Sequence, residues 1–283
     1  MEFQGILGPA ITSARAWPTT GEMRRFAQRL TPWLLPVLLL LGWEAGVRAG
    51  LIEARTLPAP SAVLVAGWEA LASGVLLHHV AVSTQRAFVG LVIGGGLGFF
   101  LGVLNGVLTS AERLTDGTLQ MLRNIPHLAI IPMVILWFGI DDTAKIFLVA
   151  LGVLFPIYIN TFHGIRTIDR GLVEMAKVYG LSSAALFWRV VLPGAMHSIL
   201  VGLRYALGIM WLTLIVAETI SASSGIGYMT MNAREFLQTD VVLLGIIIYA
   251  LLGKAADSLT RALEVRCLAW HPAYRPGATG LAP

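Results

Sequence analysis

The sequence predicts an all-α protein that crosses a membrane six times. Of its 283 residues, 56% are hydrophobic and 13% are charged, and the mean hydropathy is +0.75. Soluble domains carry about 25% charged residues, so most of this surface faces something other than water. A bilayer core of about 30 Å needs about 20 mostly apolar residues per helix. Six segments meet this requirement: residues 33–51, 87–108, 119–140, 144–165, 199–220 and 241–263.

The first apolar segment follows Arg24, Arg25 and Arg29, which gives this region some resemblance to a secretory signal peptide. The apolar run continues to Leu51 without a small-residue cleavage site after it, which favours an uncleaved helix over a removed signal. We expect residues 1–32 to form an N-terminal tail, residues 33–265 the transmembrane domain, and residues 266–283 a C-terminal tail.

A seventh apolar stretch, residues 62–82, carries Trp68, Glu69, His78 and His79. Only residues 83–86 would separate it from the next span, and so short a joint does not easily reverse two spanning helices. We therefore predict an external or interfacial helix. Adjacent residues of a helix point in different directions, so His78 and His79 form a surface pair, with a metal site as the alternative.

The basic residues support six spans rather than seven. With six, fourteen of the 20 Lys and Arg residues fall on one side of the membrane. They are Arg15, Arg24, Arg25, Arg29, Arg113, Arg123, Arg166, Arg170, Lys177, Arg189, Lys254, Arg261, Arg266 and Arg275. The positive-inside rule then predicts that both termini lie in the cytoplasm. Topology explains the sequence pI of about 9.5 better than nucleic-acid binding does.

Several predicted spans contain prolines, which kink a helix, or glycines, which let a neighbouring helix approach closely. Glycines cluster from Gly94 to Gly102, where Gly98 and Gly102 fit the small-xxx-small pattern of closely packed membrane helices. Pro126 and Pro132 lie in the third span and Pro156 in the fourth. A bundle tolerates such kinks, and these walls suit a conduit, with ordinary helix packing as the alternative.

A long connection, residues 166–198, separates the fourth span from the fifth. Leu172, Met175, Ala176 and Tyr179 recur at helical spacing. Gly180 is expected to end this helix, Ser182 to cap a second one, and Leu192-Pro193-Gly194 to stop it. Two short helices that present apolar surface to the cytosol are typical of a protein-docking module; a hairpin lying on the membrane surface is the alternative.

The connection also carries a spaced motif: Glu174-Met175-Ala176, three residues, Gly180, nine residues, Val190, one residue, then Leu192-Pro193. It resembles the EAA loop of ABC importer permeases, with Met175 in place of an alanine and Val190 in place of an isoleucine. The resemblance implies a type I ABC importer permease fold in a bacterial inner membrane. It also implies that the helix around Glu174 docks in a groove of a separate ATPase subunit.

Three further strings resemble the branch of this family that imports nitrate, taurine and aliphatic sulfonates. They are Arg123-Asn124-Ile125-Pro126, the run from Trp211 to Glu218, and the run from Ser223 to Met229. The runs from Met231 to Phe236 and from Trp270 to Tyr274 resemble aliphatic sulfonate permeases most. The resemblance therefore implies transport of a small anion, most of all an aliphatic sulfonate, with taurine, nitrate and bicarbonate as alternatives.

The sequence has no Gly-x-x-x-x-Gly-Lys-Ser/Thr motif, so ATP and Mg²⁺ would be bound by another polypeptide, and no cofactor is expected here. The chain is expected not to be an enzyme itself. The resemblance implies a complex of two copies of the chain, two ATP-binding subunits and a periplasmic or lipid-anchored solute-binding protein. An ion-driven secondary transporter and a non-transporting membrane scaffold are the alternatives from other classes.

Ionisable residues within spans usually face a bundle interior or a cavity. Glu44 with Arg48, and Lys254 with Asp257, have the spacing of helical ion pairs. Arg204 reaches the lipid headgroups, braces a neighbour or attracts an anionic substrate. Glu218 is expected to brace helices or close an outer gate. The candidate lining of the translocation path consists of Asn124, His127, Asn160, Arg204, Thr213 and Glu218, with His163 as a further polar candidate.

Overall fold

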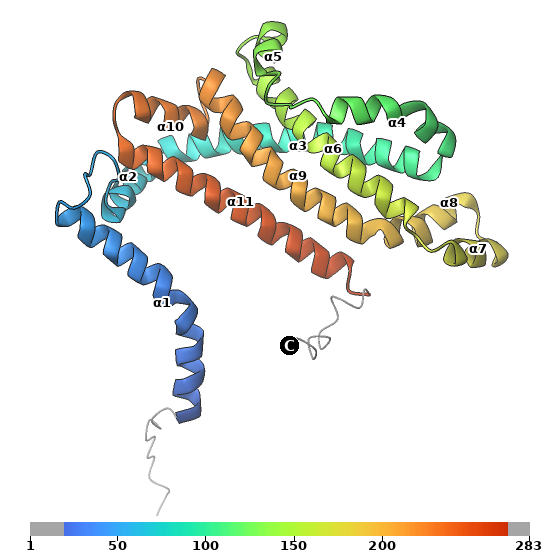
Figure 1. Cartoon of the computed structure of the whole chain (residues 1–283), viewed down its shortest axis with the longest axis horizontal. Helices are drawn as coiled ribbons and strands as arrows, with labels where there is room; N and C mark the ends of the chain where they lie inside the picture. The colour runs from blue at the N-terminus through green and yellow to red at the C-terminus, as the bar shows by residue number, and fades with distance from the viewer. Residues whose placement is uncertain (1–19, 271–283) are drawn as a thin grey trace, which may run out of the picture. The chain divides into compact units, whose positions relative to one another are not determined.

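A computed structural model describes residues 20–270, and the regular elements in that range are all helices (Figure 1). The prediction of an all-α protein is confirmed. The chain divides into two units, of which the first ends at Ala54 and the second begins at Arg55. Each unit is described by itself.

The first unit contains one described helix, α1 (Thr20–Arg48), which includes most of the first predicted span. Its leucines at positions 34, 35 and 38 are exposed, as expected for a helix surrounded by lipid. Nε of Arg48 lies 2.6 Å from Oε1 of Glu44, so the predicted pair is confirmed. Residues 20–32 of the predicted tail belong to α1, and residues 1–19 lie outside the described residues.

The second unit is built from ten α-helices and one π-helix within the described residues. They are α2 (Pro60–Ala72), α3 (Val75–Val107), α4 (Thr109–Arg123), α5 (Ile131–Phe138), α6 (Asp142–Arg166), α7 (Arg170–Val178), α8 (Ser183–Leu186), the π-helix η1 (Phe187–Val191), α9 (Leu192–Ser221), α10 (Ile226–Glu235) and α11 (Thr239–Cys267). Four helical stretches in the described part are long and apolar enough to cross a membrane: Val75–Val107, Asp142–Arg166, Ser183–Ile220 and Thr239–Cys267. They contain the second, fourth, fifth and sixth predicted spans.

The predicted boundary at residues 83–86 is wrong. The helix break lies earlier, at Gly74, whose φ of +76° is a left-handed conformation that glycine adopts without strain. Residues 62–72 therefore belong to α2, and residues 75–82 form the first turns of α3. Arg86 does not interrupt α3, because buried partners neutralise its charge.

The third predicted span, residues 119–140, is not one continuous helix. α4 ends at Arg123, a turn follows, and α5 begins at Ile131. Pro126 explains the break, since a proline disfavours helical backbone in the preceding residue and lacks an N–H group. Pro132 lies in the first turn of α5, where a proline is well tolerated.

The glycines of α3 form a closely packed contact with α6. A Cβ on Gly94 would lie 2.6 Å from Cα of Ala150, and a Cβ on Gly102 would lie 2.6 Å from Cβ of Thr161. Both distances are shorter than any real side chain could adopt. The helices therefore approach each other as closely as the small-xxx-small pattern predicts.

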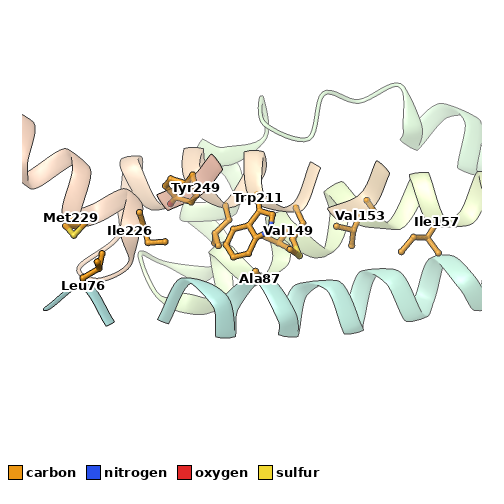
Figure 2. Packing of buried hydrophobic residues seen from close by; sticks show 12 residues of the cluster. Leu76, Ala87, Val149, Val153, Ile157, Trp211, Ile226, Met229 and Tyr249 are labelled. Atoms are coloured by element: carbon orange, nitrogen blue, oxygen red, sulfur yellow. The ribbon is translucent and has the colours of Figure 1, made fainter. Parts of the chain in front are cut away.

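The hydrophobic core joins α3, α6, α9, α10 and α11. Figure 2 shows Trp211 and Val149 next to Ala87, with Tyr249 near Trp211. The rings of Trp211 and Tyr249 meet edge to face with their centroids 6.4 Å apart. Four of the twelve buried residues of this core belong to α9.

The contact between α3 and α6 yields a stability prediction. Gly94→Ala should lower the free energy of unfolding by about 1–3 kcal/mol, because the added methyl group overpacks the backbone of α6. Gly96→Ala is the matched control on the same helix, since nothing lies within 4 Å of its Cβ position. Unfolding of the purified protein in mixed micelles would measure both, and equal stabilities would contradict the packing described.

Candidate functional site

The residues of the spaced motif form a helix with a defined end. Asp169 caps the start of α7, where its Oδ1 accepts a hydrogen bond from the N–H of Gly171 at 2.8 Å. At the other end the N–H of Gly180 donates to the carbonyl of Lys177, and that of Leu181 to the carbonyl of Ala176. This pair of bonds is the Schellman motif, which requires a left-handed residue, and Gly180 has φ +79°. The glycine four residues after Ala176 in the motif therefore serves to end α7.

The apolar side of α7 points away from the rest of the chain. Met175 is 51% exposed, Val178 86% and Tyr179 78%, whereas Ala176 is buried. A cluster of exposed apolar side chains on a helix of 9 residues marks a contact surface for a protein or a membrane. We call residues 174–193 the coupling segment.

The opposite side of α7 lines a cavity of about 550 Å³. Arg170, Glu174 and Lys177 line it together with Arg166 at the end of α6. The carboxylate of Glu174 forms no hydrogen bond or ion pair within residues 20–270. Arg166 pairs instead with Glu112 of α4. Glu174 is thus available to a partner.

The second part of the coupling segment, from Ser183 on, continues into α9 without interruption, so the predicted stop at Leu192-Pro193-Gly194 is wrong. The helix α8 is capped by Ser182, whose Oγ accepts a hydrogen bond from the N–H of Ala185 at 3.3 Å. η1 follows, and the N–H of Leu192 bonds to the carbonyl of Phe187, five residues earlier. A proline normally clashes with the carbonyl four residues before it. We attribute the wider π turn to Pro193. The π turn makes room for the proline ring, so the helix continues through it.

A buried ion pair lies at the far end of α9. Nη1 of Arg86 on α3 donates to Oε1 of Glu218 on α9 at 2.8 Å, and the two side chains are 4% and 0% exposed. Nη2 of Arg86 also lies 2.6 Å from Oδ1 of Asp142, the first residue of α6. Lys145 adds a second positive charge, 3.9 Å from the same oxygen. The four charges cancel.

Glu218 has further donors. The hydroxyl groups of Ser83 and Tyr249 donate to it at 2.8 and 3.1 Å, and the N–H of Gly227 donates at 3.0 Å. Gly225 has φ +107°, and a side chain there would collide with the Glu218 carboxylate. The run from Ser223 to Gly227 therefore wraps the carboxylate, which gives Glu218 the bracing role predicted for it.

The other candidate path residues lie apart from one another. Arg204 is 2.5 Å from Glu264 and 3.6 Å from Asp257, both on α11, which is the bracing alternative. The side-chain amide of Asn160 donates to the carbonyl of Pro156 at 2.8 Å. Asn124 is exposed at the end of α4. Nε2 of His127 and Oγ1 of Thr213 lie 3.0 Å apart, so the structure brings these two together.

The remaining predictions on charged and metal-binding residues have clear outcomes. Lys254 and Asp257 form the predicted pair at 3.6 Å. The rings of His78 and His79 do not point apart, because their centroids are 5.5 Å from each other. Nδ1 of His79 accepts a hydrogen bond from the N–H of Gly225. Groups of three or more His, Cys, Asp or Glu side chains that could hold a metal ion do not occur among the described residues, and the His78–His79 pair on its own stays untested as a metal site.

Residues 94–268 match the family described as binding-protein-dependent transport system inner membrane component. The chain is also 60% identical to the permease protein SsuC of Escherichia coli (strain K12), whose name assigns it to aliphatic sulfonate transport. That similarity covers 89% of this chain and 96% of the relative. The chain belongs to this family. It is a membrane permease of an ABC importer, and as a transport component it is not itself an enzyme.

The permease is also similar to other transport permeases and to one solved structure. It is 45% identical to an SsuC protein of Bacillus subtilis (strain 168), over 85% of this chain and 87% of the relative. Identity to the taurine transport permease TauC of Escherichia coli (strain K12) is 34%, over 90% and 92% of the two chains. The crystal structure of an amino acid ABC transporter shares the fold, with a TM-score of 0.56 at 17% identity over 66% of the permease and 92% of that chain.

Sequence reasoning missed the partners of Glu218. Ser83 and Arg86 lie in the joint expected at residues 83–86, and nothing in the sequence indicates a role for them, for Asp142 or for Tyr249. One signal was present, because Arg86 and Lys145 lie in or beside apolar runs, where a charge needs a partner of opposite sign. The pairing itself joins residues 132 positions apart.

The ion pair yields a second stability prediction. Arg86→Ala should lower the free energy of unfolding of the permease by about 3–5 kcal/mol, because it leaves the Glu218 carboxylate buried without a positive charge. The double variant Arg86→Ala/Glu218→Ala should lose less than the sum of the single variants. A double-mutant cycle in detergent measures the difference, and strict additivity would rule out the coupling.

Proposed function

We propose that the permease moves aliphatic sulfonates into the cell and is driven by a separate ATPase that docks on the coupling segment. The observation that carries the docking proposal is the orientation of α7. Its apolar side is exposed, whereas its charged side faces a cavity within the chain. A helix of this kind suits a groove on another protein. Glu174, Met175, Ala176, Gly180, Val190, Leu192 and Pro193 are the residues proposed to form or position this contact.

The proposed complex contains two copies of the permease, two ATP-binding subunits and a periplasmic or lipid-anchored solute-binding protein. The ATP-binding subunits hold ATP and Mg²⁺, so the permease needs no cofactor of its own. Both termini and residues 166–198 lie in the cytoplasm of a bacterium, on the side that carries fourteen of the 20 basic residues. Residues 33–265 form the membrane domain.

The proposed transmission of force uses one continuous helix. α8, η1 and α9 run without a break from the coupling segment to Glu218. When two ATP-binding subunits close, they would push on α7 and α8 and thereby shift α9. Arg204 links α9 to α11, so both helices would move together and change access to the path between the permease copies.

The choice of cargo follows the relatives. Identity to the two permeases named for aliphatic sulfonates is 60% and 45%, against 34% for the one named for taurine. Taurine, nitrate and bicarbonate are the competing anions. In this class of importer the solute-binding protein usually selects the cargo, so a sparsely polar path in the permease is consistent with the proposal.

The coupling segment gives a prediction with a matched control. Gly180→Val should reduce uptake and ATPase co-purification about tenfold or more, because a β-branched residue is strained at φ +79° and the helix stop is lost. Gly180→Asn should retain most activity, since asparagine tolerates the left-handed conformation. Glu174→Ala should also uncouple transport without loss of folded permease. Wild-type uptake and co-purification in both Gly180→Val and Glu174→Ala would refute the docking role.

A growth experiment tests the cargo. Deletion of the gene should abolish growth on an alkanesulfonate as sole sulfur source, and restoration of the gene should recover it. If the deletion abolishes growth on taurine or nitrate instead, the permease transports that anion. Uptake that survives removal of the ATPase would indicate an ion-driven transporter, and a stable complex without substrate-dependent ATP hydrolysis would indicate a scaffold.

A further inference from the structure

A cavity of about 390 Å³ lies at the end of α9 that is remote from the coupling segment. The short helix α10 packs there against α9 and α11 (Figure 1). Because the coupling segment is proposed to lie in the cytoplasm, this end of α9 faces the outside, and we call the cavity the outer cavity. Small-molecule sites occupy about 300–1,000 Å³, so it has room for a small ligand. Its lining consists of Thr219, Ile220, Thr230, Met231, Arg234 and Val242.

Arg234 is the charged residue of this lining, and it is exposed. Its Nη1 donates to Sδ of Met231 at 3.7 Å, and a thioether sulfur is only a weak acceptor. Within residues 20–270 the guanidinium has no acidic partner. The hydroxyl groups of Thr219 and Thr230 donate to carbonyl groups of their own helices. The guanidinium is therefore the donor in the outer cavity that is left for a ligand.

The lack of a partner distinguishes Arg234 from most basic residues outside the cytoplasmic group, which have an acidic partner. Arg48, for example, pairs with Glu44, and Arg86 is neutralised at the same end of the bundle. A guanidinium carries five N–H donors in a planar fork that matches the oxygens of an anionic group. A sulfonate spreads one negative charge over three such oxygens. Arg234 is therefore suited to bind it.

The rest of the lining selects among anions. The opposite face of α10 borders another cavity, of about 560 Å³, whose lining includes Glu69 and Asp240 and no Lys or Arg. Those carboxylates would repel a sulfonate, whereas the outer cavity has no acidic lining residue. Its apolar wall is formed by Ile220, Met231 and Val242. An anion with an alkyl chain fits this wall better than nitrate or bicarbonate, which have no chain, or taurine, whose chain ends in an ammonium group.

We propose that the outer cavity receives the cargo as it leaves the solute-binding protein. The sulfonate oxygens bind the guanidinium of Arg234, and the alkyl chain lies on the apolar wall. This inference rests on the proposed function and adds the residues that contact the cargo first. Thr219 and Ile220 belong to α9, the helix proposed to move when the ATP-binding subunits close. Movement of α9 therefore changes the outer cavity and releases the cargo towards the path.

The experiment compares Arg234→Gln, which removes the charge, with Arg234→Lys, which keeps the charge and loses the planar fork. Arg55→Gln is the matched control, because Arg55 is also exposed and outside the cytoplasmic group but does not line the outer cavity. The permease with its ATPase is reconstituted into proteoliposomes that contain ATP. Binding protein saturated with ethanesulfonate is added outside, and uptake of ethanesulfonate and ATP hydrolysis are both measured.

Arg234→Gln should lower uptake per ATP hydrolysed about tenfold, the effect of one lost hydrogen bond to a charged group, while loaded binding protein still stimulates ATP hydrolysis. Arg234→Lys should fall between this variant and the wild type, and Arg55→Gln should match the wild type. Wild-type uptake in Arg234→Gln would overturn the reception site. Equal losses of uptake and stimulated hydrolysis would also overturn it, because Arg234 would then serve docking or assembly. If the wild-type complex takes up no ethanesulfonate, the proposed cargo itself fails, and the reception site with it.

Discussion

The buried pair of Arg86 and Glu218 is the interaction on which the arrangement of the second unit depends. A charge in the interior of a membrane bundle is stable only when its partners are already in place, because desolvation is costly. The partners here come from α3, α6, α9, α11 and the run from Ser223 to Gly227. None of these elements can shift alone without leaving a charge or a hydroxyl unpaired. The cluster therefore fixes one end of the bundle as a single body.

The other end of α9 has the opposite character. Its coupling segment exposes apolar side chains and carries a glutamate without a partner in the described chain. Between the two ends, Arg204 ties α9 to α11, and small residues let α6 and α9 approach closely at Gly164 and Gly202. From Ser183 on, α8, η1 and α9 form one continuous helix, so a push on α8 meets no break before it reaches the charged cluster. A continuous helix of this kind is suited to transmit a displacement of α8 to the charged cluster at its other end.

Local signals in the sequence predicted the first part of the coupling segment, although not the continuation of its second helix through Pro193. Helical spacing, the glycine stop and the serine cap act within a few residues, so the helix after Asp169, Gly180 and the cap at Ser182 could all be predicted. The charged cluster could not, because its partners are far apart in the chain and meet only through the packing of α3 on α6. The resemblance to known permeases singled out the runs around Glu218 and Gly225 without indicating that they touch. The structure supplies that reason: Gly225 and Gly227 are small because the Glu218 carboxylate lies against them.

The prolines show why sequence alone could not predict the path. Pro126 follows the end of α4, Pro156 lies inside α6, and Pro193 follows a π turn within a continuous helix. All three lack an N–H, so the difference lies in the surroundings. Pro193 is accommodated because the turn before it can widen, whereas the chain after Pro126 unwinds beside α6. Non-helical backbone at membrane depth has to be buried in protein or line a water-filled cavity. The packing around each proline, which the sequence alone does not show, therefore decides whether the helix ends or continues there.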